Sequence, residues 1–93
     1  MEFEWDESKS ESCLSERGFD FLYVTQAFDD PEGHTVRDLR WDYGEDRFRL
    51  LAQIEKRIFC VVYTWRGSVV RIISARKANH REVKEYEDRT REA

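Results

Sequence analysis

The second half of the chain carries the side chains best suited to chemistry, a set of arginines in stretches that alternate polar and apolar residues. Arg47 and Arg49 lie in one stretch, Arg66 lies at the end of the second, and Arg71 lies in the third. The planar guanidinium fork binds two phosphate oxygens at once, which the lysine ammonium does poorly. Because the whole chain has a net charge of -4, a basic surface must be a local arrangement. The pattern predicts a site for a phosphate-bearing ligand, RNA or DNA.

Three strands must position these arginines. From residue 47 onward the sequence has a period of two, which predicts strands over 47–54, 57–65 and 69–75. The pairs Glu55-Lys56 and Gly67-Ser68 are suited to two-residue turns between them. We therefore expect an antiparallel meander.

The length of each turn decides which side chains share a face of this sheet. A two-residue turn at 55–56 sets Phe48, Leu50, Ala52 and Ile54 opposite Tyr63, Val61, Phe59 and Arg57 on the core face. The other face then carries Arg47, Arg49, Val62, Thr64, Arg66 and Arg71. Simple alternation puts Arg76 on the core side, so that it joins the others only if the strand ends or twists before Lys77.

A structural explanation competes with the phosphate interpretation. Glu45, Asp46 and Glu55 can neutralise the arginines as salt bridges at the rim, which are common and contribute little stability. An arrangement in which every guanidinium is already bound to a carboxylate would argue against the phosphate site.

The first third of the chain predicts a short strand and two helices. Phe3–Trp5 alternates as an edge strand, after which Asp6 caps a helix over 7–17 that Gly18 ends. Asp20 caps a second helix from Phe21 to about Phe28. A strand over 34–37 and a loop with Trp41 and Tyr43 follow.

The final helix is predicted from His80 to about Arg91. Asn79 and Glu82 form a capping box at its start. Only Val83 and Tyr86 are apolar on it, so we expect these two to pack a helix that lies on the surface or meets a partner.

Length and composition restrict the class of protein. The 93 residues are enough for one domain, 1–93, and Cys13 and Cys60 form no metal-binding spacing with His34 and His80. We expect no metal, no cofactor and no disulfide. No apolar run approaches the roughly 18 residues of a membrane span, and the acidic start is unlike a leader, so a cytoplasmic protein without membrane contact is expected.

The charge is unevenly distributed. Residues 1–32 have a net charge of -8, whereas residues 33–81 carry eleven Lys or Arg against five carboxylates. This polarity predicts a polyanion on the basic part and a basic partner segment on the acidic stretch from Glu2 to Glu16.

The sequence resembles the BrnT family of bacterial toxins over nearly its whole length. The most specific motif is Arg71-Ile72-Ile73-Ser74-Ala75-Arg76-Lys77-Ala78, followed by Glu82 and Tyr86. Others are Trp5-Asp6 with Lys9, Gly18, Phe28, Asp30-Pro31, Gly44-Glu45-Asp46-Arg47, Val62-Tyr63-Thr64 and Arg66-Gly67. The resemblance implies an α+β, RelE-like fold in which helices pack against an antiparallel sheet.

The resemblance also implies an activity and partners. Such a toxin is a metal-independent endoribonuclease that blocks translation until a BrnA-type antitoxin neutralises it. Two toxins and two antitoxins would form a heterotetramer, which contacts operator DNA only through the antitoxin. Attack of a ribose 2′-hydroxyl on the phosphodiester requires charge stabilisation at phosphorus.

The resemblance also implies roles for individual residues of this chain. Arg47, Arg71 and Arg76 are expected to stabilise the transition state, with Thr64 orienting the scissile phosphate. Flanking phosphates are assigned to Arg49, Arg66 and Lys77. Trp5 is either a platform for stacking a base or a lid on the core.

The sequence departs from the family at one place, and this keeps a second interpretation open. Many relatives have a histidine before the glycine that ends the first helix, but here Glu16-Arg17-Gly18 stands, so the general base is not assigned. His80 is either a substrate-binding or catalytic group or an ordinary surface histidine. A non-catalytic RNA- or protein-binding module with the same fold is therefore the alternative function.

Overall fold

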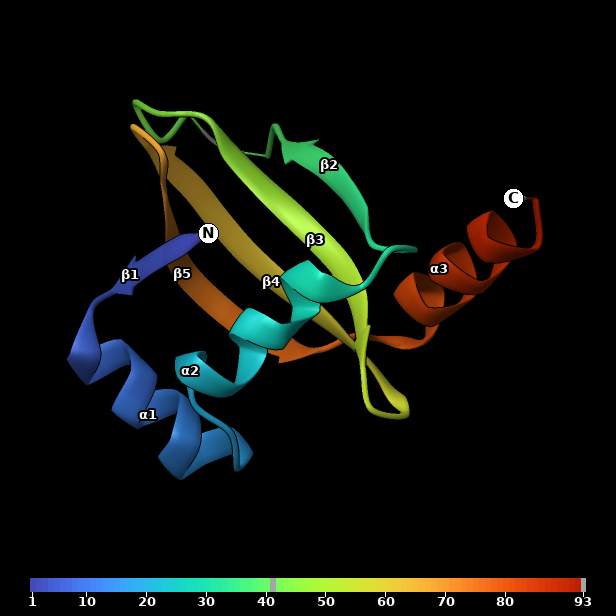
Figure 1. The fold of residues 1–93 in the computed structure, drawn as a ribbon, viewed down its shortest axis with the longest axis horizontal. Helices are drawn as coiled ribbons and strands as arrows, with labels where there is room; N and C mark the ends of the chain where they lie inside the picture. Colours follow the sequence, from blue (N-terminus) through green and yellow to red (C-terminus); the bar gives the residue numbers. More distant parts are fainter. Residues whose placement is uncertain (41, 93) are drawn as a thin grey trace.

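The computed structural model describes residues 1–40 and 42–92, so that the predicted loop position Trp41 lies outside the described residues. Figure 1 shows the helices α1 and α2 grouped at one side of a curved sheet and α3 standing apart from them. The elements are β1 (Glu2–Trp5), α1 (Glu7–Arg17), α2 (Phe21–Val24), the 3-10 helix η1 (Thr25–Asp29), β2 (His34–Asp38), β3 (Arg47–Ile54), β4 (Arg57–Arg66), β5 (Val69–Lys77) and α3 (His80–Glu92).

The sheet is mixed, which corrects the expectation of an antiparallel one. Its order is β1-β5-β4-β3-β2, and β3 to β5 form the predicted antiparallel meander. Strand β2 extends this antiparallel part by pairing with β3. Strand β1 pairs with β5 in parallel, with Glu4 beside Arg71 and Trp5 beside Ile72. Parallel neighbours need a long crossover connection, and the helices and the meander supply it. Alternation within β1 carries no information about this direction.

The second predicted helix is also corrected. It is a single α-helical turn, α2, that tightens into η1 instead of continuing to Phe28. At the junction the Thr25 hydroxyl donates to the Leu22 carbonyl at 2.7 Å, and the Gln26 amide donates to the Tyr23 carbonyl at 3.0 Å. Such side-chain bonds to the previous turn compete with the regular α-helical pattern.

The core lies between the sheet and the helices α1, α2 and η1. Its sheet side chains are those expected from parity, Leu50, Ala52, Ile54, Phe59, Val61 and Tyr63, joined by Val70, Ile72 and Ala75 of β5. From the helical side Cys13, Phe19, Phe21, Val24 and Ala27 pack against them. The predicted pairing of β3 with β4 is confirmed from Phe48 opposite Tyr63 to Ile54 opposite Arg57.

Both predicted ends of the first helix and the predicted cap of the second are confirmed. The Asp6 side chain accepts from the amides of Ser8 and Lys9 at the start of α1. Gly18 ends this helix with a φ of 87°, a left-handed conformation that a side chain would strain. Asp20 caps α2 through the amide of Tyr23.

Helix α3 packs on the opposite face of the sheet from the other helices. Tyr86 is buried there with Leu51 and Cys60, and its hydroxyl donates to Asp30 at 2.7 Å. The capping box is present, since the Asn79 amide donates to Glu82 and the Glu82 amide donates to Asn79. Within residues 1–40 and 42–92, no helix combines the length and the apolar character that crossing a membrane requires.

Candidate functional site

The sheet face opposite α1 and α2 carries the predicted arginines, and we call it the arginine face. It consists of Arg47, Arg49, Thr64, Arg66, Arg71 and Arg76. Directly paired residues project to the same side of a sheet. Thr64 pairs with Arg71, and Val62 pairs with Arg49, so that three neighbouring strands contribute to one surface.

A β-bulge brings Arg76 to this face, against the expectation from simple alternation. The pairing of β4 with β5 shifts between Val62 and Tyr63: Val62 lies opposite Ser74, but Tyr63 lies opposite Ile72. Ile73 is the extra residue, and it reverses the parity of everything after it. Arg76 therefore pairs with Cys60 and faces outward with Arg71.

Three of the arginines meet carboxylates at the edges of the face. Arg71 donates to Glu4 at 2.7 Å, a contact that the parallel β1 creates. Glu45 lies 3.4 Å from the Arg47 Nε and 3.8 Å from Arg66. Glu4 is 40% and Glu45 33% exposed, so these ion pairs are solvated and contribute at most about 1 kcal/mol each.

The other two arginines share the buried carboxylate of Glu82 in α3. Arg76 donates to both of its oxygens at 2.7 and 3.0 Å, and Arg49 donates at 3.2 Å. Burial by itself would raise the pKa of Glu82, but the bonds from Arg76 and from the Asn79 amide outweigh it and lower that pKa. Glu82 thus fixes two guanidinium groups and the start of α3 together.

Every arginine of this face has a carboxylate within 4.0 Å, as the structural explanation expects. Of the predicted partners, Glu45 is confirmed, whereas Asp46 pairs with Arg37, which lies outside this face. The other two carboxylates are Glu4 and Glu82, which were not predicted. Five arginines nevertheless share three carboxylates, which leaves the face positive. Only the exposed carboxylates, Glu4 and Glu45, are placed where an incoming phosphate can replace them.

Thr64 is positioned by the loop before β3. It is buried, and its hydroxyl donates to the Asp46 carbonyl at 2.5 Å. The Arg47 guanidinium lies 4.0 Å from the centre of the Tyr43 ring, a cation-π contact. The hydroxyl of Thr64 thus holds the loop that presents Arg47.

Three of the predicted site residues lie away from the arginine face. Trp5 is partly buried and packs against the core, edge-on to Phe21 with ring centres 6.4 Å apart. Lys77 pairs with Phe59 and projects to the helical face. His80 is the first residue of α3 and is exposed.

A groove between α3 and the sheet continues the arginine face. Its volume is about 860 Å³. The lining residues are His34, Arg40, Arg49, Arg76, Asn79, Arg81, Glu82, Lys84, Glu85, Asp88 and Arg89. Cations predominate among them, so the groove extends the path available to a polyanion.

Sequence reasoning missed the residues that organise the site. Alternation along the first strand places Glu4 on the outward face. Its partner could not be predicted, because it depends on the parallel pairing of β1 with β5 that sets Glu4 beside Arg71. Glu82 was recognised as a helix cap, yet nothing in its spacing connects it to Arg49. Tyr43 was placed only in a loop.

Asp38 fixes the loop that leads to Arg47 and gives the protein a pH dependence. It is buried, receives two bonds of 2.9 Å from Arg40 and one of 3.3 Å from the Tyr43 hydroxyl, and these bonds lower its pKa from 3.8 to about 2. A carboxylate whose pKa is lower in the folded than in the unfolded protein stabilises the fold at pH values above its unfolded-state pKa. This stabilisation is lost as the pH falls towards the folded-state pKa.

We expect the wild type to lose stability between pH 4 and 2 more steeply than Asp38→Asn, measured by urea unfolding. The exposed Asp29→Asn is the control, and equal slopes for both variants would contradict this.

Comparison with known proteins identifies the family. Residues 5–82 match the family described as ribonuclease toxin, BrnT, of type II toxin-antitoxin system. The chain belongs to the BrnT family. The matched region contains the whole arginine face and ends at Glu82. A search of curated proteins found none that matches this chain.

Family membership gives this BrnT chain a general function. It is a ribonuclease toxin of a type II toxin-antitoxin system, and such a system includes an antitoxin partner. The basic surface predicted from the arginines is thus part of a protein whose family acts on RNA.

Proposed function

We propose that this BrnT chain is an endoribonuclease whose arginine face binds the scissile phosphate, without a metal ion. In this mechanism the ribose 2′-hydroxyl attacks the adjacent phosphorus, a new O–P bond forms, and the bond to the 5′-oxygen of the next nucleotide breaks. The observation that carries the proposal is the convergence of guanidinium groups from β3, β4 and β5 on one face with an excess of positive charge.

The proposed roles separate the arginines by their partners. Arg71 and Arg47 have exposed carboxylate partners. They contact the reacting phosphate and stabilise the negative charge that develops on it. Arg66 binds a flanking phosphate. Arg76 and Arg49 supply positive potential from fixed positions on Glu82, toward the groove along α3.

The earlier assignments of Thr64, Lys77 and Trp5 change in this proposal. Thr64 holds the backbone at residues 46–47 and does not orient the phosphate, because its hydroxyl already donates a hydrogen bond to the Asp46 carbonyl. Lys77, on the other face, and Trp5, which packs against the core, are not assigned to the same phosphate. His80, at the exposed start of α3, stays a prediction.

Binding of RNA would exchange carboxylates for phosphates. A solvated ion pair is weak, whereas a bidentate arginine-phosphate contact is strong. Glu4 and Glu45 then keep the arginines extended in the free toxin and are displaced when RNA arrives. This explains why paired arginines are compatible with a binding site.

The partners and the setting are proposed from the family. We infer for this chain a RelE-like toxin fold, inhibition of translation and a cytoplasmic location. Its partner is a BrnA-type antitoxin, two toxins and two antitoxins form a heterotetramer, and the antitoxin binds the operator. The acidic stretch from Glu2 to Glu16 remains a predicted contact for a basic segment, and slower association at high salt would support it.

A non-catalytic RNA- or protein-binding module is the second candidate. The observation in its favour is that each arginine of the face already has a carboxylate partner. A purely structural network of this kind would need no substrate.

Expression of the unmutated chain by itself tests the proposal. We expect growth arrest, relieved by coexpression of the antitoxin, and cleavage of RNA by the purified protein in the presence of a metal chelator. The chemistry needs only charge stabilisation and proton transfer, which side chains supply. RNA binding without cleavage and without growth arrest would favour the second candidate, and cleavage abolished by the chelator would exclude metal independence.

A further inference from the structure

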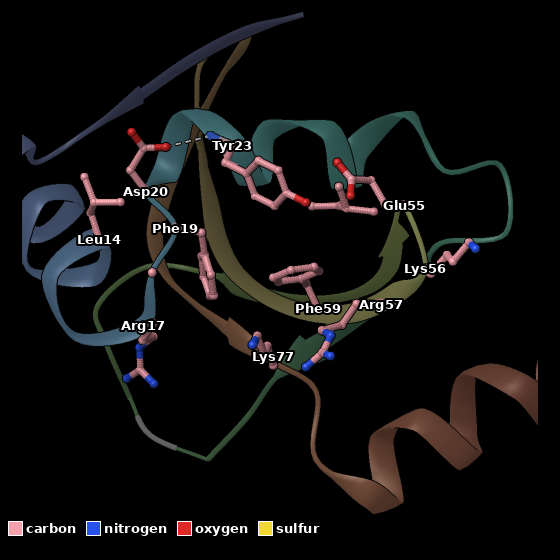
Figure 2. A pocket seen from close by; sticks show the side chains of 12 residues that line it. Leu14, Arg17, Phe19, Asp20, Tyr23, Glu55, Lys56, Arg57, Phe59 and Lys77 are labelled. Carbon is pink, nitrogen blue, oxygen red and sulfur yellow. Dashed lines mark hydrogen bonds between the residues drawn. The ribbon is translucent and has the colours of Figure 1, made fainter.

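A second basic site lies on the opposite side of the sheet, at the end formed by the β3–β4 turn. It is a pocket of about 560 Å³ between the last turn of α1, the start of α2 and the end of β5. Figure 2 shows Phe19, Phe59 and Tyr23 directed toward one another at its centre. Phe19 and Phe59 are in edge contact with ring centres 5.0 Å apart. The pocket therefore has a rigid aromatic floor.

Cations surround this floor, and within residues 1–40 and 42–92 they lack the carboxylate partners that the arginine face has. Arg17, Lys56, Arg57 and Lys77 are exposed and line the pocket from three elements (Figure 2). Among the described residues, none of the four has a carboxylate within 4.0 Å. Clustered cations without counter-ions repel one another, and a negatively charged ligand relieves that repulsion.

The carboxylates of the pocket do not cancel this charge. Asp20 and Glu55 are the two that line it, against four cations. Asp20 already accepts a bond of 2.9 Å from the Tyr23 amide as the cap of α2 (Figure 2). The pocket as a whole is positive and is suited to an anion.

The apolar part of the lining selects the kind of anion. A stacked nucleobase needs an open ring face, but Phe19 is only 7% and Phe59 only 3% exposed. Leu14, at the mouth, is 50% exposed and offers contact to an aliphatic side chain. The pocket also lies on the other face from the phosphate site, so that one RNA strand bound to the arginine face does not continue into it.

We propose that this pocket is a docking site for an acidic peptide segment that inserts an apolar side chain beside Leu14, and that the antitoxin supplies the segment. Carboxylates of the segment meet Arg17 and Arg57 on the two sides of the aromatic floor. The inference uses the two-component organisation of the family and is independent of ribonuclease activity. Because the two sites lie on opposite faces, the partner can be anchored without competing with RNA for the same arginines.

Charge reversal tests the proposal with the antitoxin of the same module as the probe. In Arg17→Glu/Arg57→Glu we expect the affinity for the antitoxin to fall by about 10-fold or more, mainly through slower association, together with a weaker dependence on salt. The matched control is Arg81→Glu/Arg89→Glu, which makes the same change of charge on exposed residues of α3 and should retain the affinity. Surface plasmon resonance at two salt concentrations measures both.

A second pair of variants tests the apolar contact. Leu14→Asp is expected to weaken antitoxin binding, whereas Leu22→Asp, at a more exposed leucine of α2, is expected to leave it unchanged. Thermal melting checks that each variant folds. If the double reversal is unstable, Lys56→Glu in the exposed turn makes the same test.

Two outcomes would overturn the proposal. One is an unchanged affinity for the antitoxin in folded Arg17→Glu/Arg57→Glu. The other is retained antitoxin binding with impaired RNA binding, which would assign the pocket to RNA. A chain that binds the antitoxin through the pocket but cleaves no RNA would support this inference while refuting the proposed enzyme.

Discussion

Replacing Arg71 with alanine is expected to lower RNA cleavage by about 10²- to 10³-fold, the usual effect of removing one group that stabilises a developing oxyanion. Arg71 lies opposite Thr64 on β4, and its carboxylate partner Glu4 is exposed. The protein should stay folded, because the lost ion pair is solvated. Single-turnover cleavage of a short RNA measures the rate.

Matched variants separate this role from a general loss of charge. Arg57→Ala removes an exposed arginine from the other face of the sheet and should leave cleavage unchanged. Arg71→Lys keeps the charge but not the fork, so we expect an intermediate rate. Equal rates for Arg71→Ala, Arg57→Ala and the wild type would show that the arginine face does not contact the reacting phosphate.

The carboxylates of the face allow a sharper distinction. If RNA displaces Glu4, then Glu4→Gln removes a competitor of the phosphate and should tighten RNA binding. If the pair is only structural, the same change should leave RNA affinity unaltered. Fluorescence anisotropy with a labelled RNA distinguishes the two results.

Glu82→Ala is expected to have the largest effect on stability, about 2–4 kcal/mol in the free energy of unfolding. Its carboxylate is 7% exposed, and its loss leaves Arg76 and Arg49 without their counter-ion. Breaking a buried pair typically costs about 3–5 kcal/mol, reduced here because Arg76 is still partly in contact with water. The change also removes the bond to the Asn79 amide that begins α3. Urea unfolding measures it.

A conservative and a distant variant complete this experiment. Glu82→Gln retains an acceptor for the Asn79 amide, so it should lose less stability than alanine. Glu87→Ala, at an exposed position of the same helix, should change stability by no more than about 0.5 kcal/mol. Equal stabilities of Glu82→Ala and Glu87→Ala would refute the role of Glu82 as the residue that joins α3 to the sheet.

Much of the arginine face was predictable because the relevant information is local. A period of two residues and turns of two residues determine which side chains of a hairpin share a face. Phe48 opposite Tyr63 and Thr64 opposite Arg71 follow from this counting alone. The caps of α1 and α3 were predictable for the same reason, since a cap is a contact between residues two or three positions apart.

The position of Arg76 was not predictable, because it depends on a bulge. One extra residue, Ile73, reverses the face of everything after it, and no turn or glycine marks the place. Whether a strand bulges depends on how β5 fits between two neighbours. The prediction for Arg76 was therefore wrong in parity although the residue was correctly grouped with the others.

Taken by itself, the sequence determined the places of the strands and turns, both ends of α1 and the starts of α2 and α3. It also determined the outward parity of Arg47, Arg49, Arg66 and Arg71, and the resemblance to BrnT toxins. These features depend on neighbours a few residues apart. Only the tertiary structure decided that Glu4 and Glu82 bind Arg71 and Arg76, 67 and 6 positions away. It also placed four cations, without a carboxylate partner among the described residues, around a pocket on the other face. The parallel β1, the bulge in β5 and the docking of α3 bring these groups together, and such contacts depend on the packing of whole elements.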